Sequence, residues 1–317
     1  MQNHLPSTFS SAGWSIRYKI FEAHPATSDG RSWSERTVVF VHGTAWSSIV
    51  FVPIAKALSA AYGCRILLYD LAGYGQSQTR PNDSASTGTG SVFLGDTSVR
   101  TQAEVFAALL THLHLDGKGP GSHQPPSVIA HDIAGALVLR AHLFHACEYK
   151  SLMLLDTNAV LPWGDGFYKL VRSNPQVFMD MPASTYGAVV RSVIRSACHK
   201  PMQTTWEDAL ASPWLDEDPA ISRERQISFV RQIAQANDAD VAEMFDQGLY
   251  KNVRCNVKLV WGSEDTWIPR HKMDELAELL QGRLRSYVAV PQAGHLLMID
   301  QPERVTVEIV SWLTIEG

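Results

Sequence analysis

The chain has few cysteines and no excess of positive charge. Four cysteines occur among its 317 residues, and no two of them have the C-x-x-C spacing of a zinc or redox site. We therefore expect reduced thiols in a cytoplasmic protein. The formal net charge of −5 at pH 7 leaves no basic footprint, so nucleic acid is not an expected partner.

Long apolar runs and cofactor motifs are missing as well. No window approaches the roughly 18 apolar residues of a membrane span, and the first residues have neither the basic nor the apolar region of a signal peptide. Neither a Walker pattern nor G-x-G-x-x-G occurs where it would bind a nucleotide. The sequence thus predicts no membrane contact, no metal and no cofactor. A small-molecule substrate is the expected partner, and a homodimer is a candidate assembly.

What the sequence does contain is the pattern of an α/β protein. Hydrophobic residues make up 45% of the chain and charged residues 19%, which suits a globular protein with a sizeable core. Strand-like apolar runs alternate with helical patterns, which predicts a mostly parallel, doubly wound sheet. The main runs are Thr37–Val41, Arg65–Tyr69, Ser127–Ile129, Leu152–Leu155, Val257–Trp261 and Ser286–Val290.

Two stretches interrupt this alternation, and one segment departs from it. Residues 81–95 and 117–126 are rich in Gly, Ser or Pro and are predicted to be surface loops. Between residues 161 and 251 only helical patterns occur. We therefore predict a core domain made of residues 1–160 and 252–317, and a helical cap of residues 161–251 that roofs the site and excludes water.

The segment from Ser127 to Ala136 is the most informative part of the chain. A short β-branched run leads into His131 and Asp132, and a helical pattern follows at once. Strand, tight turn and helix in this order form a nucleophile elbow, in which one side chain is held up on a strained bend. Small residues at positions 130, 134 and 135 let the strand and helix approach each other. Asp132 stands where the G-x-S-x-G version of this turn has serine.

Other predicted strands also end in residues that suit a catalytic site. His42-Gly43-Thr44 follows one such run, Asp265 comes shortly after another, and His295 follows the last. Along the chain the order is therefore Asp132, Asp265, His295. This order of nucleophile, acid and histidine is the one that the α/β-hydrolase fold uses.

Taken together, these motifs resemble those of the α/β-hydrolase superfamily. They comprise H-G-x from position 42, D-x-x-G-Y-G-x-S from 70, small-H-D-x-small-G from 130, G-x-x-D-x-x-I-P from 262 and G-H from 294. With aspartate as the nucleophile, the chain is similar to the branch that contains epoxide hydrolases and haloalkane or haloacid dehalogenases. The resemblance extends from about Ser15 to Leu313 and implies an α/β-hydrolase fold with an inserted helical cap.

The chemistry of Asp132 points to a saturated, electrophilic carbon as its target. A carboxylate that attacks an ester would give a reactive anhydride, whereas attack on an epoxide carbon or a carbon–halogen bond gives an ordinary ester that water can hydrolyse. We therefore predict a hydrolase that acts on a small, largely apolar substrate through an alkyl-enzyme ester. Epoxide opening is the leading reaction, and dehalogenation is an alternative.

The other catalytic roles follow from the resemblance. His295 would deprotonate water, because the nucleophile is already ionised at neutral pH. Asp265 would orient His295, and Asp156, at the end of the preceding strand-like run, stays open as the alternative acid. The backbone N–H groups of Thr44 and Ile133 would form the oxyanion hole, each contributing about 3 kcal/mol of transition-state stabilisation.

Two positions help to separate the candidate reactions. Haloalkane dehalogenases hold the halide with Trp after the nucleophile and often with Asn after H-G, where this chain has Ile133 and Thr44. Fluoroacetate-type enzymes need Arg after the nucleophile. Epoxide hydrolases usually show H-G-x-P and Asp-Trp, where this chain has Ala45 and Ile133 instead. They also need cap tyrosines to protonate the opening oxygen. Tyr168 and Tyr186 are available for that role, with Tyr250 where the cap ends.

Several residues are candidates for contact with the substrate. His131 is also expected to brace the elbow, and His42 to hydrogen-bond the loop around the oxyanion site. The candidates are His42, Trp46, His131, Tyr168 and Tyr186.

Two non-hydrolytic functions are alternatives for a protein of this fold. Cyclases and cofactor-free oxygenases on this fold use a His–Asp pair as a base without a covalent nucleophile, and the departures at Ile133 and Thr44 motivate that alternative. The second alternative is a receptor that binds a ligand under the cap without converting it. The complete set of Asp132, Asp265 and His295 argues against it.

Overall fold

The protein was analysed as a computed structural model, which describes residues 4–25, 33–78, 95–117, 123–163 and 166–316. Of the predicted loop 81–95, only Gly95 lies inside these ranges, and the predicted loop 117–126 lies partly outside them. None of the helices in the described part of the chain combines the length and apolar character needed to cross a bilayer.

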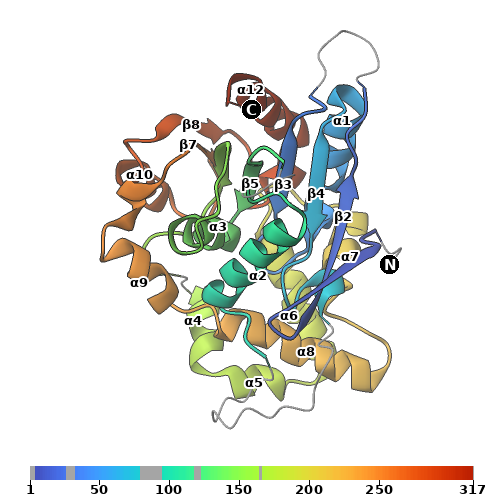
Figure 1. The fold of residues 1–317 in the computed structure, drawn as a ribbon. Helices are drawn as coiled ribbons and strands as arrows, with labels where there is room; N and C mark the ends of the chain where they lie inside the picture. The colour runs from blue at the N-terminus through green and yellow to red at the C-terminus, as the bar shows by residue number, and fades with distance from the viewer. Residues whose placement is uncertain (1–3, 26–32, 79–94, 118–122, 164–165, 317) are drawn as a thin grey trace.

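A single sheet of eight strands forms the centre of the molecule (Figure 1). Its spatial order is β1-β2-β4-β3-β5-β6-β7-β8; β1 and β2 pair antiparallel, and all pairs from β4 to β8 are parallel. The predicted mostly parallel, doubly wound sheet is confirmed. The strands are β1 (Ser7–Ser11), β2 (Trp14–Phe21), β3 (Thr37–Val41), β4 (Arg65–Tyr69), β5 (Ser127–His131), β6 (Ser151–Leu155), β7 (Asn256–Gly262) and β8 (Leu284–Val290).

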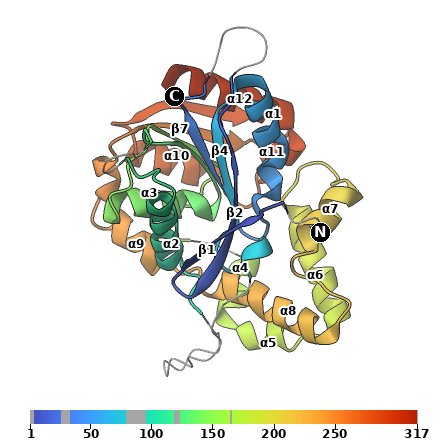
Figure 2. The ribbon, with the colours of Figure 1, turned by 45° about the vertical axis from the view of Figure 1, so that its right-hand side comes forward.

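Continuous apolar runs form the middle of this sheet because helices cover both of its faces. Every residue of β3, β5 and β6 is buried. Helices α2 and α3 lie side by side on one face, and α1 and α12 on the other (Figures 1 and 2). The helices of this core are α1 (Val52–Tyr62), α2 (Val99–His112), α3 (Ile133–Phe144), α10 (Arg270–Leu279), α11 (Leu297–Asp300) and α12 (Pro302–Glu316), with short 3₁₀ turns η1 (Ser48–Phe51) and η2 (Gly75–Ser77).

A set of helices, which we call the helical insert, stands between β6 and β7. The described residues of this segment contain no strand, and its helices gather at the end of the sheet where the parallel strands finish (Figure 2). That the insert acts as a cap stays a prediction. Its elements are α4 (Gly166–Ser173), α5 (Pro175–Met179), α6 (Ala183–Ser196), α7 (Thr204–Ala211), α8 (Pro219–Ala234), α9 (Ala239–Phe245) and η3 (Leu249–Asn252).

Helix α8 fastens the insert to the core. Ser228 Oγ and Gln232 Nε2 both donate to the carbonyl oxygen of Gly73, at 3.1 and 3.0 Å. Gly73 has a φ of +82°, and a Cβ at this position would lie 2.3 Å from Gln232 Nε2. Only glycine therefore allows the loop after β4 to come this close to α8.

Candidate active site

The turn between β5 and α3 has the geometry of a nucleophile elbow. Asp132 has φ +56° and ψ −125°, a conformation that costs a non-glycine residue free energy. Its backbone N–H donates to Leu155 O at 3.0 Å, which ties the bend to the neighbouring strand. A Cβ on Gly135 would lie 2.2 Å from Thr157 Cγ2, so the small residues predicted around the turn are needed for close packing.

The two carboxylate oxygens of Asp132 have different surroundings. Oδ2 accepts a hydrogen bond from the backbone N–H of Thr44 at 3.0 Å, and the N–H of Ile133 also bonds the carboxylate. Oδ1 lies 3.6 Å from Nε2 of His295. One of the predicted oxyanion donors, the Thr44 N–H, thus holds Oδ2, and Oδ1 faces the imidazole.

His295 is oriented by Asp265. Its Nδ1 lies 2.8 Å from Asp265 Oδ2, and the second oxygen of Asp265 accepts from the backbone N–H groups of Trp267 and Ile268, at 2.7 and 3.0 Å. The imidazole and both of its carboxylate neighbours are buried. The hydrogen bonds of Asp265 hold the imidazole in place, because the alternatives leave a buried charge without a partner.

Electrostatics make Asp132 and His295 an ion pair. Burial by itself lowers the pKa of His295, but the carboxylates of Asp265 and Asp132 outweigh it and raise the pKa well above its ordinary value. Burial by itself raises the pKa of Asp132, but the hydrogen bond and positive charge of His295 outweigh it and lower the pKa. Asp132 is therefore ionised, beside a cationic imidazole.

Asp156, the alternative acid, lies close by without bonding to His295. Its Oδ1 accepts from the Gly262 N–H at 2.7 Å, and its Oδ2 has no hydrogen-bond partner among the described residues. Burial and the negative charge of Asp265 raise the pKa of Asp156 well above its usual range. The structure therefore brings Asp265, and not Asp156, into hydrogen-bond contact with the imidazole.

His131, Asp156 and His295 place potential metal-ligand atoms within 4.8 Å of one another. Both nitrogens of His131 are already engaged, however: Nδ1 accepts from Trp46 Nε1 at 3.3 Å, and Nε2 contacts His295 O at 2.8 Å. Burial and the nearby His295 lower the pKa of His131 to about 3. His131 is therefore neutral and supports the elbow through these two contacts, so neither of its ring nitrogens is available to a metal ion.

The polar candidates behind the nucleophile do not reach the substrate space. His42 Nε2 accepts from the Leu71 N–H at 3.0 Å and its Nδ1 contacts Gly43 O at 2.9 Å. His42, Trp46 and His131 are fully buried, and none is among the described residues that line the cavity over Asp132. The expectation that these three contact the substrate is thus corrected; their ring nitrogens are used to hold the loops.

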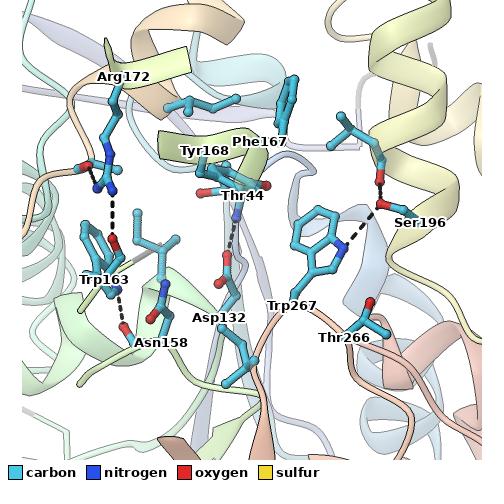
Figure 3. Close-up of a pocket in the computed structure, with 15 residues that line it drawn as sticks. Thr44, Asp132, Asn158, Trp163, Phe167, Tyr168, Arg172, Ser196, Thr266 and Trp267 are labelled. Carbon is cyan, nitrogen blue, oxygen red and sulfur yellow. Dashed lines mark hydrogen bonds between the residues drawn. The ribbon is translucent and has the colours of Figure 1, made fainter. Parts of the chain in front are cut away.

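A cavity of about 200 Å³ opens above Asp132, with walls from both the core and the insert (Figure 3). Most of its wall is apolar or aromatic, which suits a small, largely apolar molecule. The residues lining it are Thr44, Asp132, Ile133, Asn158, Trp163, Phe167, Tyr168, Arg172, Val193, Ser196, Ile233, Ala236, Thr266, Trp267 and Ile268.

The candidate tyrosines are placed differently from one another. Tyr168, on α4, lines the cavity and its ring meets Trp267 edge to face at 5.5 Å. Tyr186, on α6, instead donates to Trp214 O at 3.3 Å and packs against Phe229. Tyr250 donates to Ala159 O at 2.5 Å. Tyr186 is therefore corrected from a site residue to a packing residue of the insert, because its hydroxyl is used there.

Sequence reasoning missed much of the cavity wall. Trp267 stacks on the ring of His295 at 4.9 Å and donates through Nε1 to Ser196 Oγ at 3.3 Å. Trp163 donates through Nε1 to Asn158 O at 2.8 Å. Both tryptophan N–H groups of the wall are thus used inside the protein. Position alone could have suggested two of these residues, since Trp267 and Asn158 each stand two places after a candidate acid.

The fold, the elbow and the order of the three catalytic candidates are those of an α/β hydrolase. The sequence profile of the alpha/beta hydrolase family matches residues 38–308, and the chain therefore belongs to this family. No curated protein matches the chain.

Solved structures share the fold over nearly the whole length. An alpha/beta hydrolase fold protein from Burkholderia ambifaria is 28% identical, with a TM-score of 0.77 and 97% of each chain covered. A thermophilic esterase from Thermogutta terrifontis is 19% identical, with a TM-score of 0.67 and 100% of each chain covered. A haloalkane dehalogenase from Bradyrhizobium elkani is 17% identical, with a TM-score of 0.69 and 97% of each chain covered. The esterase and the dehalogenase are similar in fold alone.

Proposed function

We propose that this protein hydrolyses a small, largely apolar epoxide through an ester between Asp132 and a ring carbon. One observation carries the proposal: Asp132 stands at the elbow with Oδ2 on the Thr44 N–H and Oδ1 directed to the imidazole of His295. A carboxylate held in this way has one oxygen free to attack and one already positioned where negative charge will develop.

In the first step, Oδ1 of Asp132 bonds to a ring carbon and the carbon–oxygen bond of the epoxide breaks. The electron pair stays on the ring oxygen, which takes a proton from the hydroxyl of Tyr168. The ester that forms carries no charge, so the pKa of His295 falls once Asp132 no longer supports its positive charge. His295 then gives up its proton, which restores the Tyr168 hydroxyl.

In the second step, neutral His295 takes a proton from water, and the hydroxide bonds to the ester carbon of Asp132. The negative charge develops on Oδ2, against the N–H groups of Thr44 and Ile133. The ester bond breaks, the leaving alkoxide takes the proton from His295, and a diol is released. The new carboxyl group of Asp132 ionises and returns its proton to His295.

Epoxide opening is favoured over dehalogenation by the donors around the cavity. A halide leaving group needs N–H donors, and the N–H groups of Trp163 and Trp267 are already given to protein acceptors. An epoxide oxygen instead needs an acid, and Tyr168 lines the cavity. Ester hydrolysis, although it occurs on this fold, is disfavoured because attack by Asp132 on an ester would form an anhydride.

Trapping the ester tests the proposal. In His295→Gln the second step has no base, so incubation with styrene oxide should add the mass of one epoxide to the peptide that contains Asp132, as measured by mass spectrometry. The double variant Asp132→Asn/His295→Gln is the control and should gain no mass. An adduct from chlorohexane but none from the epoxide would indicate a dehalogenase. Turnover without any adduct at Asp132 would favour a cyclase or oxygenase that uses the His–Asp pair as base. Tight binding without turnover would favour a receptor.

A further inference from the structure

Asn158 is a pocket residue to which no role has yet been given. It lies in the loop after β6, next to the nucleophile, and its side chain lines the cavity together with Asp132 (Figure 3). Its Oδ1 atom is buried and has no hydrogen-bond partner among the described residues. An amide in that condition loses free energy relative to one that is paired, unless something else in the cavity bonds to it.

The backbone around Asn158 is held on both sides. Its N–H donates to the carbonyl oxygen of Asp132 at 3.2 Å, and its own carbonyl accepts from Trp163 Nε1 at 2.8 Å. Trp163 O in turn accepts from Arg172 Nη2 at 2.8 Å. This chain of hydrogen bonds runs from the elbow to α4 of the insert, so the amide stands at a preorganised position beside the attacking carboxylate.

The hydrogen-bonding capacity of the Asn158 amide limits which chemical groups of a substrate it can bind. A side-chain amide presents a donor and an acceptor that rotation about its last bond can exchange. A hydroxyl group both donates and accepts, so it satisfies the amide in either orientation. An anionic group is disfavoured, because Arg172, the cation that lines the cavity, already donates to Ala236 O, Trp163 O and Asp238.

We propose that Asn158 is a specificity-determining residue that binds a hydroxyl group on the carbon next to the epoxide ring. The substrate class is then the epoxy alcohols. The hydroxyl is assigned to the adjacent carbon because the backbone N–H of Asn158 donates to the backbone carbonyl of Asp132, the residue proposed to attack the ring, and the side chains of both residues line the same cavity. This inference rests on the proposed function only for the identity of the reacting group.

A matched pair of substrates tests the proposal. Phenylglycidol and β-methylstyrene oxide have the same aromatic epoxide skeleton and differ by one hydroxyl group. The wild-type protein should favour phenylglycidol in kcat/KM by about tenfold, the effect of one well-placed hydrogen bond with a buried polar partner. In Asn158→Leu, which keeps the size and the backbone hydrogen bonds, the ratio should fall to near unity, because the loss falls on phenylglycidol.

Ser196→Ala is the control variant. It also removes a polar group from the cavity wall, but one that already contacts Val193 O and Trp267 Nε1 inside the protein. The ratio between the two substrates should therefore stay as in the wild type. Equal losses with both substrates in Asn158→Leu would mean that the residue acts on structure alone, and an unchanged ratio would mean that the amide does not meet the hydroxyl; either result overturns the proposal.

Binding measurements separate this inference from the proposed function. Trp163 and Trp267 line the cavity, so their fluorescence reports ligand binding without any turnover. The triol derived from phenylglycidol should bind the wild type more tightly than the diol derived from β-methylstyrene oxide, and Asn158→Leu should lose that preference. If neither epoxide is turned over but the preference is present, only the epoxide chemistry fails. If Asn158→Leu does not fold, Asn158→Ala replaces it, and a wild type without preference for the triol overturns the proposal directly.

Discussion

The protonation state of His295 changes between the two steps of the proposed reaction. In the free protein, Asp265 and Asp132 raise the pKa of His295 and keep the imidazole cationic, while His295 lowers the pKa of Asp132 and keeps it ionised. Attack therefore begins from the charged pair. Once Asp132 becomes a neutral ester, one of the two supports of the imidazolium is gone, and the base needed for the second step appears only after the first step is complete.

The two steps should consequently respond differently to pH. Because the pKa of Asp132 is lowered, ester formation should persist as the pH falls below the ordinary range of an aspartate, about 4. Ester hydrolysis needs neutral His295 and should be lost at a higher pH, as the pH falls through the pKa of the imidazole in the ester. Acidification should thus make the ester accumulate, which rapid quenching and mass spectrometry can follow. Loss of ester formation before ester hydrolysis would contradict this account.

The two acids beside His295 should also differ. Asp265→Asn removes the carboxylate that orients the imidazole, and we expect turnover to fall by about 10³- to 10⁴-fold. Asp156→Asn should cost about threefold or less, because the raised pKa of Asp156 makes it a neutral acceptor for the Gly262 N–H, a role that an amide can fill. Its φ of +41° is also one that Asn tolerates. Steady-state kinetics of both variants measure the two losses of turnover. A larger loss in Asp156→Asn than in Asp265→Asn would make Asp156 the orienting acid.

At the scale of secondary-structure elements, the elbow depends on how closely α3 approaches the loop after β6. Alanine is a better helix former than glycine, so Gly135→Ala would stabilise an isolated helix by about 1 kcal/mol. In this protein the new Cβ would lie 2.2 Å from Thr157 Cγ2 and 2.6 Å from Thr157 Oγ1. Packing thus overrides propensity at this position.

Gly135→Ala should therefore destabilise the protein by about 1 to 3 kcal/mol and lower activity, because α3, which begins directly after Asp132, and the loop after β6 must move apart. Urea unfolding measures the first effect and turnover the second. Gly282→Ala is the control, since its Cβ would meet nothing within 4 Å. Adding Thr157→Ala to Gly135→Ala should restore part of the stability. A double variant no more stable than Gly135→Ala alone would argue against this clash.

At the scale of the whole molecule, the core and the insert divide the site between them. The segments that follow β5, β7 and β8 supply Asp132, Asp265 and His295, whereas α4, α6 and α8 supply much of the cavity wall. The geometry of the site then depends on contacts that hold the insert in place. One of these is the ion pair between Arg140 on α3 and Glu243 on α9, with Arg140 only 3% exposed.

Breaking this pair should destabilise the whole protein. Glu243→Gln leaves the buried guanidinium of Arg140 without its anion and also breaks the more exposed pair of Glu243 with Arg100, and we expect a loss of about 1 to 2 kcal/mol in the free energy of unfolding. Glu148→Gln breaks a pair with Arg254 in which both side chains are 42% exposed, and should cost about 0.5 kcal/mol or less. Urea denaturation measures the free energy of unfolding of both variants. Equal losses would show that the contact with α9 stabilises the protein no more than an exposed ion pair does.

The class of fold and the identity of the candidate nucleophile follow from local patterns in the sequence. The apolar runs, the small residues around Asp132 and the order of Asp132, Asp265 and His295 are local patterns, and each element follows from residues close together in the chain. Those signals were sufficient for the sheet and for the elbow, which the structure bears out in its backbone angles.

Which of the candidate residues meet in the cavity depends on how distant elements pack together. Tyr168 and Tyr186 look alike in sequence, yet one lines the cavity and the other donates to Trp214. Asp265 and Asp156 both follow strands, yet one bonds to His295. The physical reason is that a side chain's partner is set by packing between elements far apart in the chain, where a rotation of one helix position moves a hydroxyl from a cavity into a wall.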